Sequence, residues 1–302
     1  MKRTILFAGL SLLFAACSNE SEQPIVVETP EDGLTSVTVH VNEFQIATEE
    51  FSEARQMTRG VEEPWSYKGI GAITLAFYDV NGKEVYQHKQ IFEDGNTFST
   101  FGQFKTNLPI GHYTLVALGY LYNSTDKFTL ISPTEAAFTS EKPRETFTLA
   151  QNVTVSSKEP LDLTVTLKRI TARLEIHSTD DVSPSIKYIR TTYSNGGKRF
   201  NPSTGYSLDN TGFSQTQSAN MDNNKKLFTS SNAFLVTDSL YTTITIEALD
   251  SVNKALFTKQ IDNVPLKRSA KTTITGPIFT AGTSSAGIKL DTDWLPGYEV
   301  TF

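Results

Sequence analysis

The stretch LPIGHYTLVALGY, residues 108–120, predicts a β-strand that is buried on both of its faces. A proline-containing turn opens the stretch, and the strand follows from about residue 112. One face carries Tyr113, Leu115, Ala117 and Gly119, and the other carries Val116 and Leu118. Apolar side chains on both faces are typical of a strand that has a layer packed on each side.

The rest of the chain repeats this pattern of short strands and turns. Runs rich in Val, Ile, Thr, Phe and Tyr alternate with clusters of Gly, Asn, Asp, Ser and Pro, and helical periodicity is hard to find. Asn81 and Gly82 separate two such runs and form the strongest short-range hairpin signal. We expect strands at about 36–45, 69–79, 84–92, 99–105, 112–120, 145–150, 161–168, 170–177, 185–193, 241–249, 255–262, 271–279 and 286–292. The sequence therefore predicts an all-β protein built from β-sandwiches.

The N-terminus has the layout of a secretory signal. Two basic residues precede an apolar run at residues 5–16, which ends in the small residues Ala15 and Ala16. The run is shorter than the ~20 residues that a membrane-spanning helix needs. We expect residues 1–16 to be a signal peptide that is absent from the mature chain.

Cys17 is the only cysteine in the 302 residues, so no intramolecular disulfide is possible. Its position directly after the small residues resembles a bacterial lipoprotein signal, in which the cysteine is lipidated, although Phe14 stands where the pattern usually has leucine. Acyl chains on Cys17 would hold the chain on a membrane. Residues 17–34 are polar and acidic, as in a flexible tether, and their start is similar to the export signal of surface lipoproteins in the Bacteroidetes. We therefore expect an outer membrane lipoprotein displayed on the cell surface.

Charge and motif content argue against several functional classes. A formal net charge of −6 and a pI near 5.4 disfavour nucleic acid as a partner. The sequence contains no G-x-S-x-G, Walker, GxGxxG or CxxC motif, and we assign no catalytic residue and no cofactor. The four histidines are scattered singly without a metal-ligand spacing, so we assign no metal site either; they are His40, His88, His112 and His177.

A domain boundary is expected where two strand-like runs meet around Arg169. This places an N-terminal β-sandwich domain at residues 35–169 and a C-terminal one at residues 170–302. A long polar insertion follows the boundary and is rich in Gly and Asn, with little to bury. Segments of this kind are usually either functional or disordered.

Aromatic residues near the expected loops suggest one possible function, stacking on sugars. The alternative is that they close the ends of the sandwich cores, where amphipathic rings often lie. These aromatic residues are Trp65, Tyr67, Tyr120, Tyr122, Tyr206 and Phe213.

Two arginines lie in an acidic, loop-like segment at residues 50–65, directly after the first expected strand. In EARQMTRGVEEPW, residues 53–65, Arg55 and Arg59 are candidate protease sites. Arg59 is the better candidate because the small Gly60 follows it and leaves the arginine accessible. The other interpretation is two solvated arginines in an ordinary loop.

Three stretches and the C-terminus, together with the lipoprotein signal and the arginine-bearing loop, resemble the fimbrillins, the subunits of type V pili of Bacteroidales and their anchor and tip relatives. The stretches are LPIGHYTLVALGY, LTVTLKRITARLEI and VPLKRSAKTTITGPIFT, and the C-terminal sequence is DTDWLPGYEVTF. The resemblance implies two tandem transthyretin-like β-sandwich domains and assembly by strand exchange. It also implies that an arginine-specific protease releases the first strand and that a strand of a neighbouring subunit fills the groove.

The resemblance assigns roles to two segments of this sequence. The removable strand would be the run whose apolar residues are Val37, Val39, Val41 and Phe44. The incoming strand would come from the C-terminal run, with Ile288, Leu290, Trp294, Val300 and Phe302 as the candidate residues. The alternative for residues 286–292 is that they complete the sheet of their own domain.

Three functions remain open at this point. The first is a structural fimbrial subunit that acts in cell adhesion, with other fimbrial subunits and the outer membrane as partners. The second is an anchor or tip subunit that does not polymerise and keeps its first strand. The third is a glycan-binding surface lipoprotein whose partner is a host or bacterial surface glycan or protein.

Overall fold

The computed structural model describes residues 33–45, 61–62, 70–92, 100–122, 124, 128–138, 142–220, 225–280 and 286–291. Within these ranges the chain forms strands and no α-helix, so the prediction of an all-β fold is confirmed. None of the described segments is a helix that could cross a membrane.

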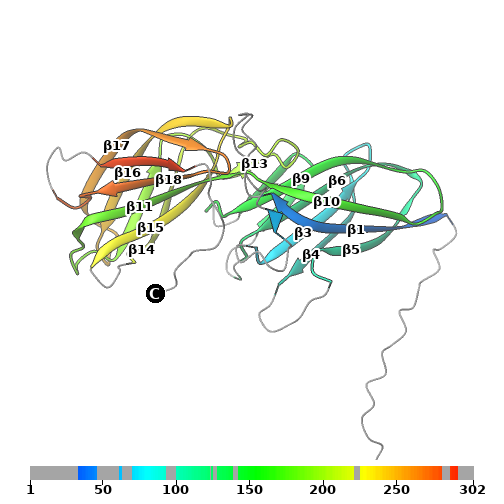
Figure 1. The fold of residues 1–302 in the computed structure, drawn as a ribbon, viewed down its shortest axis with the longest axis horizontal. Helices are drawn as coiled ribbons and strands as arrows, with labels where there is room; N and C mark the ends of the chain where they lie inside the picture. Colours follow the sequence, from blue (N-terminus) through cyan, green and yellow to red (C-terminus); the bar gives the residue numbers. More distant parts are fainter. Residues whose placement is uncertain are drawn as a thin grey trace, which may run out of the picture.

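The first group of strands forms one eight-stranded sheet in the order β2-β1-β10-β9-β6-β3-β4, with β5 also paired to β1 (Figure 1). These strands are β1 (Leu34–Gln45), β2 (Val61–Glu62), β3 (Ala72–Tyr78), β4 (Glu84–Ile91), β5 (Gln103–Pro109), β6 (Gly111–Tyr120), β9 (Thr146–Val155) and β10 (Leu161–Arg169). The register joins β9 to β10 only at Thr148–Lys168 and Phe147–Arg169, so the sheet folds over at this corner. The layer β5-β1-β10 then faces the layer β9-β6-β3-β4, with a common hydrophobic core between them.

Strand β6 confirms the two-sided burial expected from its sequence. Tyr113, Leu115 and Ala117 belong to the core between the two layers. Val116 and Leu118 point the other way, into a separate cluster. Both sets are buried because a layer covers each face of this sheet.

The second group of strands forms two four-stranded sheets, β15-β11-β18-β19 and β14-β12-β16-β17. These strands are β11 (Thr171–Asp181), β12 (Tyr188–Tyr193), β14 (Phe213–Ser218), β15 (Lys226–Phe234), β16 (Ser239–Leu249), β17 (Ala255–Lys267), β18 (Lys271–Gly276) and β19 (Gly287–Asp291). A second hydrophobic core fills the space between the sheets. The predicted boundary falls between β10, which ends at Arg169, and β11, which begins at Thr171; the division into two domains stays a prediction.

The two groups share one strand topology. In each, the first strand pairs in parallel with the last strand on one side and antiparallel with a middle strand on the other, as β1 does with β10 and β5, and β11 with β18 and β15. The opposite layers, β9-β6-β3-β4 and β17-β16-β12-β14, also correspond strand for strand. Strand β19 is the addition: it extends the second group on the far side of β18.

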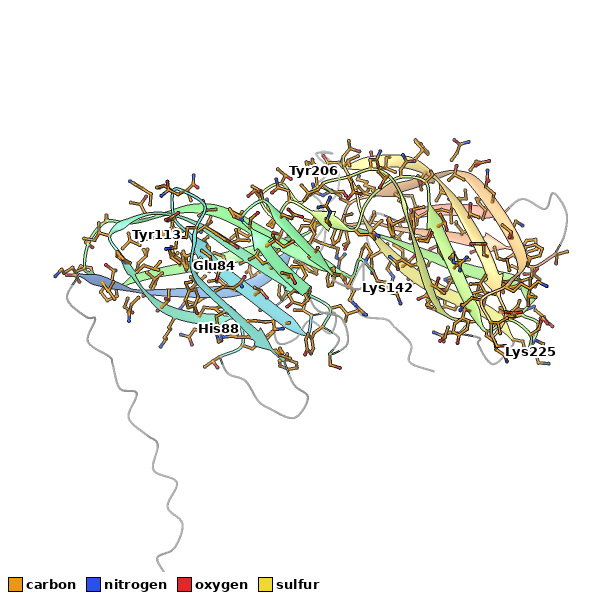
Figure 2. The ribbon with its side chains drawn as sticks, turned by 180° about the vertical axis from the view of Figure 1, so that it is seen from behind. Glu84, His88, Tyr113, Lys142, Tyr206 and Lys225 are labelled. Carbon is orange, nitrogen blue, oxygen red and sulfur yellow. The ribbon has the colours of Figure 1, made fainter. Side chains whose placement is uncertain are left out.

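A third cluster joins the two groups. Strands β7 (Phe128–Ser132), β8 (Glu135–Phe138) and β13 (Arg199–Phe200) form a small sheet, and β13 comes from the insertion that follows the boundary. Phe200 and Phe234 pack here against the outer face of β3 and β6. Figure 2 shows Tyr206 where the two groups meet. The expectation that the insertion has little to bury is therefore wrong, since Phe200 and Phe213 are both buried.

Candidate functional site

Strand β1 is the centre of its layer. Its first half pairs antiparallel with β5, from Leu34–Pro109 to His40–Gln103, and most of its length pairs in parallel with β10, from Val37–Leu161 to Gln45–Lys168. Near its end β2 takes the place of β5, opposite Phe44 and Gln45. The main-chain groups of β1 are thus matched on both sides, and removing β1 would leave those of β5 and β10 unpaired.

The core-facing side chains of β1 are fully buried. Val37, Val39, Val41 and Phe44 are between 0% and 2% exposed. The alternation in VTVHV puts the three valines on one face, and a bulge opposite β10 between Val41 and Glu43 shifts the phase so that Phe44 points inward and Glu43 points to solvent. Burial of each of these side chains contributes about 1.5–3 kcal/mol of hydrophobic free energy.

Phe44 occupies a site that a glycine leaves open. A Cβ atom on Gly119 of β6 would lie 2.6 Å from Cε1 of Phe44, far inside the contact distance of two carbon atoms. The ring of Phe147 lies 5.0 Å from that of Phe44 on another side. Gly119 in the opposite layer therefore determines where the end of β1 can sit.

The strand β5, on one side of β1, is also held from the opposite layer. Gln90 on β4 donates through Nε2 to the Gln103 carbonyl (2.6 Å) and accepts through Oε1 from the Gly102 amide (2.8 Å). The Gly102 carbonyl in turn accepts from the Val41 amide of β1 (2.8 Å). Gln90 thus links the edge strand β4 to β5 at the point where β5 meets β1, so β5 has a contact that does not depend on β1.

A sequence profile described as "Family of unknown function (DUF6562)" matches residues 35–298, nearly the whole chain beyond the N-terminal segment. The chain belongs to this family. No curated protein matches the chain by sequence.

Several solved structures of Bacteroidales proteins are similar to this family member in fold. A candidate polysaccharide-binding protein (DUF1812) from Bacteroides thetaiotaomicron is 11% identical, has a TM-score of 0.50 and covers 84% of this chain and 97% of its own. A candidate adhesin from Bacteroides ovatus is 11% identical (TM-score 0.49; 82% and 88% covered), as is the fimbrial anchor protein Mfa2 from Porphyromonas gingivalis (TM-score 0.46; 88% and 100% covered). The resemblance to the fimbrillins is confirmed at the level of the fold.

The remaining predicted site residues of this family member fall into two sets. Ile288 and Leu290 lie on β19, where they pair with Ile274 and Thr272 of β18, and they are 39% and 37% exposed. They complete the sheet of their own group as an edge strand in this structure. Cys17, Arg55, Arg59, Trp65, Tyr67, Trp294, Val300 and Phe302 lie outside the described residues.

Two of the aromatic residues predicted to stack on sugars are buried in the structure. Tyr120 is 1% exposed and lies within 3.2 Å of the Thr74 hydroxyl, and Phe213 is 6% exposed and stacks on Tyr193. Tyr206 is half-buried under Arg268 and donates its hydroxyl to Asp238. Tyr122 is half-buried as well, with the Lys89 ammonium 5.5 Å from its ring centre. Tyr120 and Phe213 are therefore core residues, Tyr120 in the third cluster and Phe213 in the core of the second group.

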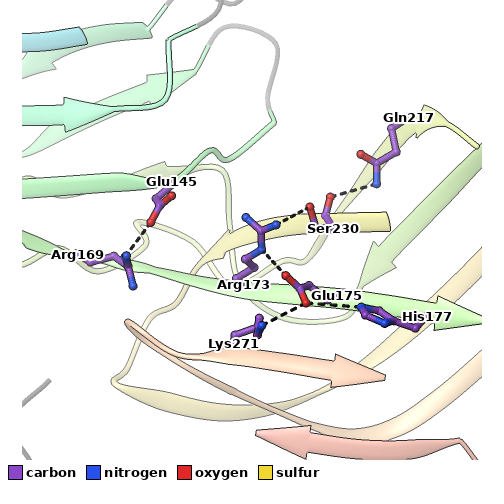
Figure 3. A network of polar contacts seen from close by, with 8 residues as sticks. All are labelled: Glu145, Arg169, Arg173, Glu175, His177, Gln217, Ser230 and Lys271. Atoms are coloured by element: carbon purple, nitrogen blue, oxygen red, sulfur yellow. Dashed lines mark hydrogen bonds and ion pairs between the residues drawn. The ribbon is translucent and has the colours of Figure 1, made fainter. Parts of the chain in front are cut away.

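The titratable groups form one notable cluster, on the outer face of the second group (Figure 3). Glu175 on β11 lies between Arg173 (3.0 Å), Lys271 (3.4 Å) and His177 (3.6 Å). Burial raises the pKa of Glu175, but the three neighbours outweigh it and lower the pKa to about 2. The described residues contain no cluster of three side chains that could hold a metal ion. The arrangement is a structural charge network centred on the Glu175 carboxylate.

Sequence reasoning missed the contacts that position β1. Gln90 is one of the two glutamines on β4, and only its hydrogen bonds to β5 across the open side of the sandwich distinguish it from Gln87. Gly119 did carry a signal, since a glycine inside a strand often marks a close approach of another group.

Proposed function

We propose that this protein is a structural subunit of a surface fimbria, assembled by strand exchange after an arginine-specific protease removes β1, and that it acts in cell adhesion. The observation that carries the proposal is the place of β1. It lies at the centre of its layer, its core-facing side chains are fully buried, and the chain continues from it through the segment that contains Arg55 and Arg59.

Cleavage in that segment has a defined physical consequence. It would separate β1, with everything N-terminal to it, from the remaining strands. The bare groove between β5 and β10 would expose the apolar core and two rows of unpaired main-chain groups, a state that is costly until another strand enters. A strand from a neighbouring subunit would restore the main-chain hydrogen bonds, and its alternate side chains would fill the positions of Val37, Val39, Val41 and Phe44.

Cleavage after β1 would also determine which fragment carries the lipid. If Cys17 is acylated and the chain is cut after Arg59, the anchor leaves together with β1. A mature subunit would then be held at the cell surface by its neighbours in the fimbria and not by its own lipid. The candidate donor strand is the C-terminal run that begins with β19, whose Ile288 and Leu290 sit at an exposed edge.

One observation favours a second function, a fimbrial anchor that keeps β1. Strand β2 begins at Val61, directly beyond the segment with the two arginines, and pairs back onto Phe44 and Gln45. This pairing ties both ends of the segment to the same strand and opposes the release of β1.

Limited digestion of residues 18–302 with an arginine-specific protease tests the proposal. The expected result is one cut, after Arg59 or Arg55, shown by the mass of the new N-terminus, followed by oligomers on a native gel. An Arg55→Lys/Arg59→Lys double variant should stay intact and monomeric, whereas an Arg199→Lys control, with the same change at an exposed position on β13, should be cut and assemble as before. A wild-type chain that resists the protease, or is cut but stays monomeric, would contradict the polymerising role.

A further inference from the structure

The outer edge of β10 carries no strand over most of its length, within the part of the chain that the structure describes. Strand β1 occupies one side of β10 from Leu161 to Lys168. On the other side β9 pairs only with Lys168 and Arg169. From Leu161 to Leu167 this second side is an open sheet edge.

The main-chain groups at this edge can be assigned from the strand geometry. The Ile170 amide, directly after β10, donates to the Thr146 carbonyl of β9 (3.0 Å) and so points to the outer side. Because peptide groups of successive residues alternate in direction, the N–H and C=O groups of Asp162, Thr164 and Thr166 point to the outer side as well. The edge thus presents three residues ready to pair with an added strand.

In the second group of strands, the edge that corresponds to the open edge of β10 is occupied by a strand. Strand β18 corresponds to β10, and its outer edge is occupied by β19, which runs antiparallel to it. The Ala270 carbonyl, just before β18, accepts from the Arg173 amide of β11 and so points toward β11. Because main-chain groups alternate in direction, those of Lys271, Thr273 and Thr275 point the other way, toward β19. The triad Asp162, Thr164 and Thr166 matches the triad Lys271, Thr273 and Thr275 in direction, spacing and two of three residue types.

Apolar side chains line the open edge of β10. Leu161 and Leu163 point toward the core but are only half-buried, and Leu149 of β9 lies half-buried against the same core. Farther along β10, Val165 and Leu167 are buried. An added strand with aliphatic residues at alternate positions would cover this strip of three leucines.

The charge at the start of the edge differs between the two groups. Lys271 faces Asp291 in the register of β18 and β19. In the first group the corresponding residue is the exposed Asp162, of opposite sign. A strand added at β10 therefore needs a basic residue where β19 has its aspartate.

We propose that the outer edge of β10 binds an extended segment of a partner polypeptide as an additional antiparallel strand, with aliphatic residues at alternate positions and a lysine or arginine facing Asp162. This site uses the side of β10 that lies opposite to β1. It is available while β1 is in place, and it does not depend on proteolysis or on the proposed fimbrial assembly.

Two labelled peptides test the site on the intact chain, residues 18–302. One has the sequence of residues 286–292, and the other carries Asp291→Lys. Fluorescence anisotropy should show that the Asp291→Lys peptide binds more tightly, by about two- to fivefold, because opposite charges that face each other across strands stabilise the pair. Amide exchange of Thr164 and Thr166 should slow when this peptide is added.

A charge reversal in the protein makes the test specific. Asp162→Lys should invert the preference, so that the unchanged peptide binds more tightly. Glu84→Lys, a charge reversal of the same sign at an exposed position of the edge strand β4, should leave the preference as in the wild type. The proposal is overturned if neither peptide binds, if the preference does not invert, or if the slowed amides lie on another edge. Faster exchange of the β1 amides would also overturn it, since the peptide would then be displacing β1.

Discussion

At the scale of single residues, Gly119 and Glu175 show how a small chemical feature fixes a larger element. Gly119 gives Phe44 the space to anchor the end of β1, and Glu175 compensates three surrounding basic side chains on β11 and β18. A single substitution removes each feature, and each substitution should lower the free energy of unfolding.

Gly119→Ala should destabilise the protein by about 1–3 kcal/mol, because the new methyl group displaces the Phe44 ring from a packed core. Urea unfolding measures the loss, and the amides of β1 should exchange faster. Gly287→Ala is the matched control: its Cβ would meet only the Thr275 carbonyl at 3.6 Å, and the stability should change little. If both alanine variants unfold at the same urea concentration, the close approach of Phe44 is not a constraint.

Glu175 should contribute to stability in a defined pH range. Its pKa is lowered in the folded protein from 4.5 to about 2, so its stabilising effect is present in full above the unfolded value and is lost as the pH falls through the interval between the two. Glu175→Gln should therefore lower the unfolding free energy at pH 7, and the difference from wild type should shrink between about pH 4.5 and pH 2. A difference that is the same at both pH values would contradict the network.

At the scale of elements, the side-chain link from β4 to β5 predicts that β5 keeps its place independently of β1. Gln90→Ala removes two hydrogen bonds and leaves the Gly102 amide without its partner, which should cost about 1–3 kcal/mol. Hydrogen exchange along β5 should accelerate. Gln87→Ala, on the exposed face of the same strand, should leave β5 unchanged; an equal effect of both variants would show that Gln90 has no special role.

Sequence patterns predicted most elements because apolar alternation marks a strand that borders a core. β1, β3, β4, β6, β10 and β16 lie within a few residues of the expected ranges. β15 was missed because two of its inward residues are the polar Thr229 and Ser231; the Ser231 hydroxyl, for example, is hydrogen-bonded with the Tyr193 hydroxyl inside the core. β5 was expected at 99–105 but spans Gln103–Pro109, since residues 100–102 form a turn in front of it.

At the scale of the whole molecule, the two groups of strands are joined by contacts that the sequence does not reveal. Arg169 is fully buried at the junction, and its Nε lies 2.9 Å from Glu145 Oε1 (Figure 3). Its guanidinium also lies over the Phe147 ring. The Thr148 hydroxyl donates to the Pro202 carbonyl across the same junction. Local patterns could not predict this junction, because it is built from residues far apart in the sequence.

Arg169→Ala should lower stability by about 3–5 kcal/mol, because it breaks the buried ion pair with Glu145. The loss should also separate the unfolding of the two groups, which calorimetry would detect as a broadened or split transition. Arg190→Ala, which breaks the more exposed pair with Glu247, should cost about 1 kcal/mol or less and leave a single transition. Equal losses in the two variants would contradict a junction that couples the groups.

The central claim is that β1 is a strand that can leave and be replaced. Native mass spectrometry of the arginine-cleaved chain, mixed with an isotope-labelled peptide of residues 33–45, tests it most directly. We expect the original N-terminal fragment to be lost and the labelled peptide to bind in its place in a one-to-one complex. A cleaved chain that keeps its own β1 and takes up no labelled peptide would contradict the claim and point to an anchor that retains its first strand.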